Sequence, residues 1–205
     1  MPKISPDHRA ARRQSILDAA RRCFLRNGFH ATSMQDIQAE ADLSAGGIYV
    51  YFKSKEEIIE AIALDTIAFF KKGLEEVLGS DDLPSLDVAL GRVLMLMIEY
   101  DRQQPVFLMS LQIWAVVGNT PHLAASFMEN QQEVHAMFRR LIERYQTQGY
   151  LDPLVPAEQT AQVLVTLIMG FVARWALLGP VDMPTFLVGL RSIVTQNVQK
   201  LHPDR

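Results

Sequence analysis

Residues 44–57 read SAGGIYVYFKSKEE. Two adjacent glycines lead into three aromatic residues, although each glycine weakens a helix by about 1 kcal/mol relative to alanine. On a helical projection, Ile48 and Phe52 share one face and can enter a core. The opposite face carries the two glycines and Val50, with a tyrosine on either side. The pattern predicts a short helix whose smooth face comes close to another surface.

Helix start and stop signals recur along the rest of the chain, and no strand-like alternation is present. Thr32 with Gln35 predicts a capping box, Ser44 predicts a cap, and Ser54 with Glu57 predicts another. We expect an all-α fold of nine helices. Their approximate ranges are 7–26, 32–41, 44–53, 54–78, 85–102, 105–118, 121–148, 157–178 and 184–201.

The first three helices are short, and a tight turn at Asp42-Leu43 joins the second to the third. This arrangement predicts a helix-turn-helix DNA-binding domain over residues 1–53. We expect residues 54–205 to form a larger helical domain for effector binding and dimerisation.

Charge is distributed unevenly along the chain. The net charge is −3 overall, but residues 1–55 hold nine lysines and arginines against five carboxylates, and residues 56–205 hold 11 against 18. The positive N-terminal part indicates a surface that faces a polyanion. The N-terminal arm, with Lys3, Arg9, Arg12 and Arg13, is consistent with either a minor-groove contact or a disordered basic tail.

Several function classes are excluded by the residues present. The single cysteine, Cys23, rules out an intrachain disulfide and a multi-cysteine metal site. No phosphate loop, nucleophile elbow or dinucleotide fingerprint occurs, so we expect no enzyme activity, cofactor or metal. The longest apolar run, residues 163–178, is short for a membrane span. We expect a cytoplasmic protein without a membrane partner.

Four motifs at fixed spacing carry a family resemblance. They are Ile-Leu-x-Ala-Ala from Ile16, Gly-Phe-x-x-Thr-Ser from Gly28, Ser-x-Gly-x-Ile-Tyr-x-Tyr-Phe from Ser44 and Ser-Lys-Glu from Ser54. Together they resemble the DNA-binding region of the TetR family of bacterial transcriptional regulators. The match covers about residues 16–59, and its spacing holds through four elements.

The resemblance implies a set of DNA-binding residues. Thr32 and Ser33 would contact phosphate at the start of the second helix, and Tyr51 and Lys55 would hold the DNA backbone. The residues implied to lie along the groove are Ser44, Ala45, Gly46, Gly47 and Tyr49. Direct base reading would depend on few side chains, namely Ser44, Tyr49 and Gln35, so DNA shape would supply much of the specificity. The alternative for both tyrosines is packing between helices.

The last two helices are expected to form a homodimer interface. The helix over residues 157–178 is apolar around nearly its whole circumference, and such a helix must be covered on all sides. The resemblance implies that this helix and the last one pair with their copies in a four-helix bundle. The interface residues expected are Gly170, Phe171, Leu187, Leu190 and Val194. A dimer also suits a palindromic double-stranded DNA operator.

The middle of the chain is rich in methionine and aromatic residues, which suits a pocket for an apolar effector. The candidate residues are Met97, Asp101, Phe107, Trp114, Phe127, Gln131, Phe138, Arg174 and Trp175. Ordinary core packing is the alternative for the apolar residues. For Asp101, Gln131 and Arg174, which interrupt apolar stripes, the alternative is a polar group satisfied at a helix end or at the dimer contact.

Two functions remain open on sequence. The first is a homodimeric, ligand-responsive transcriptional regulator, and family usage favours a repressor that an apolar effector releases from its operator. The second is an all-α carrier or enzyme that uses the C-terminal cavity directly. The charge distribution favours the regulator, because a carrier does not need a positive N-terminal domain.

Overall fold

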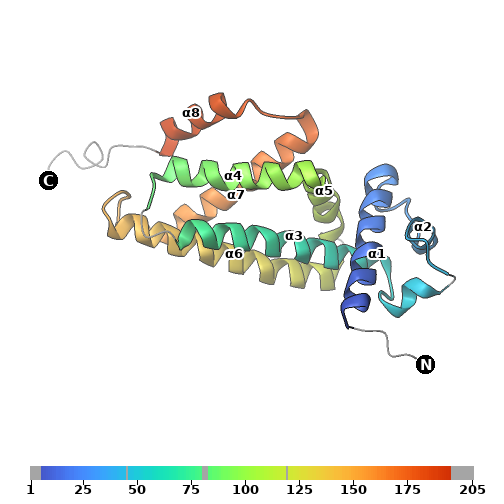
Figure 1. Ribbon diagram of the computed structural model, residues 1–205. Helices are drawn as coiled ribbons and strands as arrows, with labels where there is room; N and C mark the ends of the chain where they lie inside the picture. The colour runs from blue at the N-terminus through green and yellow to red at the C-terminus, as the bar shows by residue number, and fades with distance from the viewer. Residues whose placement is uncertain (1–5, 45, 80–82, 119, 195–205) are drawn as a thin grey trace, which may run out of the picture. The chain divides into compact units, whose positions relative to one another are not determined.

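The computed structural model describes residues 6–44, 46–79, 83–118 and 120–194, and these residues form helices without a strand among them (Figure 1). The all-α prediction is confirmed. Eight elements are α-helices, and the predicted third helix is a 3-10 helix, η1. In chain order they are α1 (Pro6–Asn27), α2 (Met34–Glu40), η1 (Gly47–Val50), α3 (Lys55–Leu78), α4 (Leu86–Gln103), α5 (Val106–Val117), α6 (Pro121–Thr147), α7 (Ala157–Leu178) and α8 (Met183–Val194). The part of the last predicted helix beyond residue 194 lies outside the described residues.

The chain divides into two compact units. Unit 1 takes in the chain up to Thr66 together with Leu108–Phe127. Unit 2 takes in Ile67–Phe107 and the chain from Met128 onward. The division therefore falls within α3, α5 and α6. It differs from the expected boundary after residue 53, because unit 1 also includes the start of α3 and most of α5.

Unit 1 is built around one apolar core. Its buried side chains come from α1, α2, η1, the start of α3, α5 and the start of α6; they include Ile16, Phe24, Ile37, Ile48, Phe52, Ile58, Ile62, Met109, Ile113 and Leu123. A polar contact supports this packing, because the Gln112 side-chain amide donates to the Phe24 carbonyl at 3.2 Å. The helix-turn-helix elements are thus held by a segment that is distant in sequence.

Unit 2 contains α4 and α8 in direct contact. At Gly91 of α4, an added Cβ would lie 3.0 Å from the Leu187 side chain of α8, so the glycine permits the close approach. The rings of Phe69 and Tyr100 stack with centroids 3.9 Å apart, which joins α3 to α4. Tyr145 of α6 is fully buried.

The Tyr145 hydroxyl donates to the Pro84 carbonyl at 2.6 Å. Burial raises the pKa of Tyr145 to about 12, because the charged phenolate is disfavoured away from water. The unfolded value is about 10, so stability from this group is present below pH 10 and is lost as the pH rises through about 12.

A spectrophotometric titration of tyrosine at 295 nm tests this. We expect one late step near pH 12, and Tyr145→Phe should remove it and make alkaline unfolding less steep. Tyr49→Phe, which changes an exposed ring of η1, should leave the late step in place. A late step that survives Tyr145→Phe would contradict the assignment.

Helix α7 is unusual in its exposed apolar surface. By length and composition it is apolar enough to cross a membrane, and only 22% of its apolar window is buried. Core helices of non-membrane proteins satisfy the same criteria. Its exposed residues therefore need a covering surface, and a second protein chain is one such surface.

Candidate nucleic-acid interface

The start of α2 carries the first residues expected at phosphate. Ser33 is the N-cap: its hydroxyl accepts from the Asp36 N–H at 3.1 Å, and the Asp36 carboxylate accepts from the Ser33 N–H at 2.7 Å. The Ser33 N–H and the Ser33 hydroxyl both donate to the Asp36 carboxylate and lower its pKa, and the N–H has the larger effect. The capping box expected at Thr32 and Gln35 is therefore wrong by one residue.

Tertiary packing explains this difference of one residue. The Thr32 side chain is 1% exposed, and its hydroxyl donates to the Gly28 carbonyl at 2.8 Å and the Cys23 carbonyl at 3.3 Å. It is therefore turned into unit 1. Ser33 is half-buried and Gln35 is exposed, so these two side chains stand nearer the surface.

The predicted recognition helix is shorter than expected. Gly46 is the N-cap of η1 with φ 81°, a left-handed conformation that favours glycine and interrupts the helical path. The expectation of a longer helix capped by the Ser44 side chain is wrong. Ser44 contributes its backbone carbonyl, which accepts from the Gly47 N–H at 2.9 Å. Ala45 lies outside the described residues.

Even so, η1 has the two faces that its sequence predicts. Ile48 and Phe52 are 0% and 4% exposed, whereas Tyr49 and Val50 are 51% and 68% exposed. The outward face also includes the exposed backbone at Gly46. Tyr51 is half-buried and packs against the core of unit 1, so the packing alternative describes its ring.

The two glycines make a matched pair for testing the backbone of this turn. Gly46→Ala is expected to lower the free energy of unfolding by about 1 kcal/mol, because an L side chain is strained at φ 81° even in open space. At Gly47 the added Cβ meets Ser44 Oγ at an ordinary 3.4 Å, so Gly47→Ala should change stability by less than about 0.5 kcal/mol. Urea unfolding of both variants measures the difference, and equal losses would contradict the assigned strain.

Part of the positive charge of the N-terminal region is neutralised within unit 1. Arg22 and Arg26 of α1 pair with Glu40 of α2 at 2.7 and 3.1 Å. Both hydrogen bonds lower the pKa of Glu40, and the one from Arg22 has the larger effect. Arg21 pairs with Asp18 at 2.9 Å. Arg9, Arg13 and Lys53 are exposed. The Arg13 guanidinium lies 5.3 Å from the centroid of the Phe52 ring, and the Lys53 backbone N–H donates to the Glu57 carboxylate at 2.7 Å.

Lys55 is the first residue of α3 and was expected to hold the DNA backbone. Its ammonium instead points toward the turn between α1 and α2, where it donates to the carbonyls of Phe29 at 2.7 Å and Thr32 at 2.8 Å. In this structure Lys55 therefore contacts its own chain.

The residues expected to contact an effector fall in both units. Trp114 and Phe127 belong to unit 1, and Trp114 packs against its core. The other seven belong to unit 2, and three of them are buried: Met97, Phe107 and Phe138. Phe107 and Trp175 meet edge to face with centroids 5.9 Å apart. The structure thus brings Phe107 and Trp175 of the expected set into contact in unit 2, and it places Trp114 against the core of unit 1.

Two of the three polar candidates in that set cap helix ends. The Asp101 carboxylate accepts from the Phe107 N–H at 2.8 Å at the start of α5. Burial raises the pKa of Asp101, and the backbone N–H groups that it caps oppose this rise. Arg174 is exposed and donates to the Gly179 carbonyl at 2.7 Å beyond the end of α7. Gln131 is half-buried on α6.

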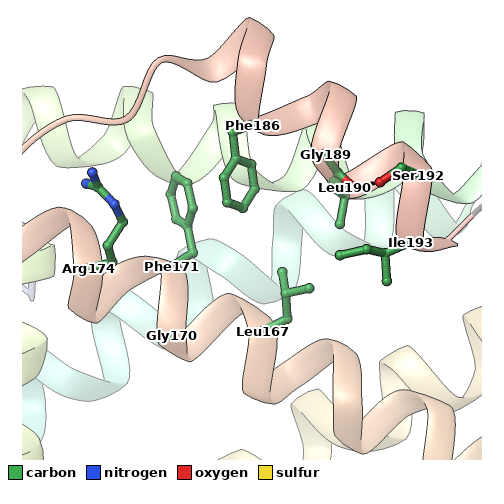
Figure 2. A pocket seen from close by; sticks show the side chains of 9 residues that line it. All are labelled: Leu167, Gly170, Phe171, Arg174, Phe186, Gly189, Leu190, Ser192 and Ile193. Atoms are coloured by element: carbon green, nitrogen blue, oxygen red, sulfur yellow. Dashed lines mark hydrogen bonds between the residues drawn. The ribbon is translucent and has the colours of Figure 1, made fainter.

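A hollow of about 500 Å³ lies between α7 and α8 (Figure 2). Figure 2 shows the rings of Phe171 from α7 and Phe186 from α8 side by side. Their centroids are 5.1 Å apart, so the two rings are in contact. Its lining is mostly apolar and consists of Leu167, Gly170, Phe171, Arg174, Phe186, Gly189, Leu190, Ser192 and Ile193. Three residues expected at a dimer interface, Gly170, Phe171 and Leu190, therefore come together here.

The other two expected interface residues lie differently. Leu187 faces Gly91 of α4 within the same unit, and Val194 is half-buried. The expected interface set does not include the large apolar side chains that α7 and α8 leave most exposed; these are Val163, Leu177, Leu178, Val188 and Ile193, each at least 63% exposed. The sequence signal that could have identified those on α7 is the apolar character of this helix around nearly its whole circumference.

A helix-turn-helix unit in a chain whose remaining helices form a second unit is typical of DNA-binding regulators. Residues 16–62 match the family described as bacterial regulatory proteins, tetR family, and residues 89–201 match the BetI-type transcriptional repressor C-terminal domain. The chain belongs to the TetR family of bacterial transcriptional regulators. The family match favours a regulator over a carrier or an enzyme.

Individual relatives agree with this assignment. The transcriptional repressor Rv1474c of Mycobacterium tuberculosis is 27% identical over 176 residues, covering 86% of this chain and 88% of the relative. The structure of Salmonella enterica GusR superimposes with a TM-score of 0.75 at 27% identity, over 94% of this chain and 97% of that one. Bacillus subtilis FadR, solved with stearoyl-CoA, gives a TM-score of 0.76 over 90% and 98% of the two chains; at 16% identity it shares the fold alone.

Proposed function

We propose that the protein is a cytoplasmic, homodimeric repressor that binds a palindromic operator and is released from it by a small, largely apolar effector. The observation that carries the proposal is the outward face of η1. It presents exposed backbone at Gly46 beside Tyr49 and Val50, while Ile48 and Phe52 anchor it in unit 1. Such a face can approach a DNA groove closely, and the tyrosine hydroxyl can reach phosphate or a base edge.

Specific DNA contacts are proposed on both sides of the turn between α2 and η1. The side chains that the packing leaves near the surface are Ser33, Gln35, Ser44 and Tyr49. Val50 offers apolar contact with a thymine methyl group. Because few polar side chains lie on this face, much of the sequence preference would come from DNA shape.

Dimerisation through α7 and α8 would cover the surface that the single chain leaves open. Ile193 is 67% exposed and lines the hollow, and at helical spacing Val163, Leu177 and Leu178 fall on the side of α7 that carries Leu167 and Gly170 of its lining. In a twofold dimer the same face meets itself, and two recognition elements can then reach half-sites about 34–36 Å apart or a multiple of it.

The effector site is proposed within unit 2. Phe107 and Trp175, two of the residues expected at the effector, meet edge to face with centroids 5.9 Å apart, which supplies an apolar lining. The structure of a fold relative, FadR, holds an acyl-CoA. Helices α3 and α5 run from unit 2 into unit 1, so a ligand that prefers one arrangement of unit 2 could bias DNA binding through them.

Selection of the purified protein against random duplex DNA tests the proposal. We expect enrichment of a palindrome, and a binding constant that falls steeply with salt because lysine and arginine contacts release counterions. Failure of the folded protein to enrich any duplex would overturn DNA binding. The selected operator then serves in a screen of apolar compounds, where a saturating effector should weaken binding; a bound compound that leaves operator affinity unchanged is not an inducer.

A further inference from the structure

Lys55, at the start of α3, contacts three backbone carbonyls and an aromatic ring. Its ammonium donates to the carbonyls of Phe29 and Thr32 at 2.7 and 2.8 Å and lies 3.5 Å from the His30 carbonyl. It also lies 4.4 Å from the centroid of the Phe29 ring. A lysine ammonium has three N–H donors, and three carbonyls surround this one.

These carbonyls belong to the turn that leads into α2. Helix α1 ends at Asn27, and Gly28 follows with φ 79°. The chain then reaches Ser33, the N-cap of α2. Lys55 therefore links the start of α3 to the segment that sets where α2 begins.

One peptide group makes the link specific. A trans peptide is planar, and its C=O and N–H point in opposite directions. The peptide between Thr32 and Ser33 gives its carbonyl to Lys55 and its N–H to the Asp36 carboxylate at 2.7 Å. Lys55 and the capping box thus hold the two ends of the same peptide group.

We infer that Lys55 is a positioning residue for operator binding: it orients the Thr32–Ser33 peptide, and with it the start of α2, and does not bind phosphate. The inference deepens the proposed function and rests on it. A phosphate contact from the ammonium would require release of carbonyls that already occupy its donors, and the aromatic ring beneath it favours the position that it holds.

The salt dependence of operator binding distinguishes the two roles of Lys55. Lys55→Met keeps the side-chain stem and removes the donors. We expect operator affinity to fall about tenfold, affinity for a non-specific duplex to stay within about twofold, and the slope of log K against log salt to stay unchanged. If Lys55 instead bound phosphate, its loss would weaken binding to the operator and to the non-specific duplex by the same factor. It would also reduce the slope of log K against log salt by about 0.9 for each subunit. That result would overturn the inference.

Two further variants complete the test. Lys55→Gln, whose amide can still donate to carbonyls, should recover part of the operator affinity with the wild-type slope, and it replaces Lys55→Met if that variant fails to fold. Lys53, two residues earlier, is exposed, and Lys53→Met removes the same charge there. Lys55→Met must lower operator affinity more than Lys53→Met does.

Hydrogen exchange and thermal unfolding separate positioning from a general loss of stability. In Lys55→Met we expect faster hydrogen exchange at the amides of Ser33 and Asp36. The measurement is made at a temperature at which the variant is fully folded. A lower melting temperature with unchanged operator affinity would show a merely structural role and overturn the inference. If the wild type itself selects no operator, the proposed function fails first and the inference fails with it.

Discussion

Ile193→Glu is expected to sediment as a monomer and to bind the operator about 100-fold more weakly or worse. Ile193 lines the hollow between α7 and α8 and is 67% exposed in the single chain, so a charge there should cost the isolated fold little. In a twofold dimer the position occurs twice, and both carboxylates would be buried without partners. The loss of affinity follows because a monomer no longer gains from the second half-site.

Sedimentation velocity and an operator titration measure this effect. Met128→Glu is the matched control, because Met128 is 61% exposed and lies on α6. We expect the control to remain dimeric and to bind the operator as the wild type does. If Ile193→Glu stays dimeric at the same concentration, the protein pairs through another face, and the apolar surface of α7 and α8 needs a different partner.

Element positions followed closely from the sequence where local signals were strong. The long apolar run and the stop at Gly179-Pro180 predicted α7 at 157–178, and the structure has Ala157–Leu178. The inward Ile48 and Phe52 were also predicted correctly, because a burial pattern depends on side-chain direction more than on the exact type of helix.

Local signals failed where two interpretations fitted the same residues. Thr32 with Gln35 and Ser33 with Asp36 both have the spacing of a capping box. The choice depends on which side chain the core accepts, and burial of Thr32 against the end of α1 decides it. At η1 the glycine pair allowed a helix but did not require one, and Gly46 takes the left-handed conformation instead.

The composition of unit 1 could not be predicted from neighbouring residues. Trp114 lies in a part of the chain that is rich in methionine and aromatic residues, so it was assigned to an effector pocket. In the structure it packs against the core that includes Ile48 and Phe24. A contact between residues this far apart in sequence leaves no periodic signature, because the pattern of α5 is the same whichever core it enters.

Ile113→Ala is expected to lower the free energy of unfolding by about 2–5 kcal/mol and to weaken operator binding. Ile113 lies on α5 and is 7% exposed within the core of unit 1. Truncation to alanine removes buried methyl and methylene groups and leaves a cavity. Because this core also holds Ile37 and Ile48, amide exchange near both residues should become faster.

Leu108→Ala supplies the control on the same helix. Leu108 is 42% exposed, so we expect a smaller loss of stability and little change in amide exchange around η1. If Ile113→Ala destabilises the chain but leaves the amide protection near Ile48 unchanged, residues 108–127 do not stabilise the DNA-binding elements of unit 1. If protection falls, α5 is a structural part of that unit although its first turn, capped by Asp101, belongs to unit 2. A change at that capped end could then alter operator binding through α5 as well as through α3.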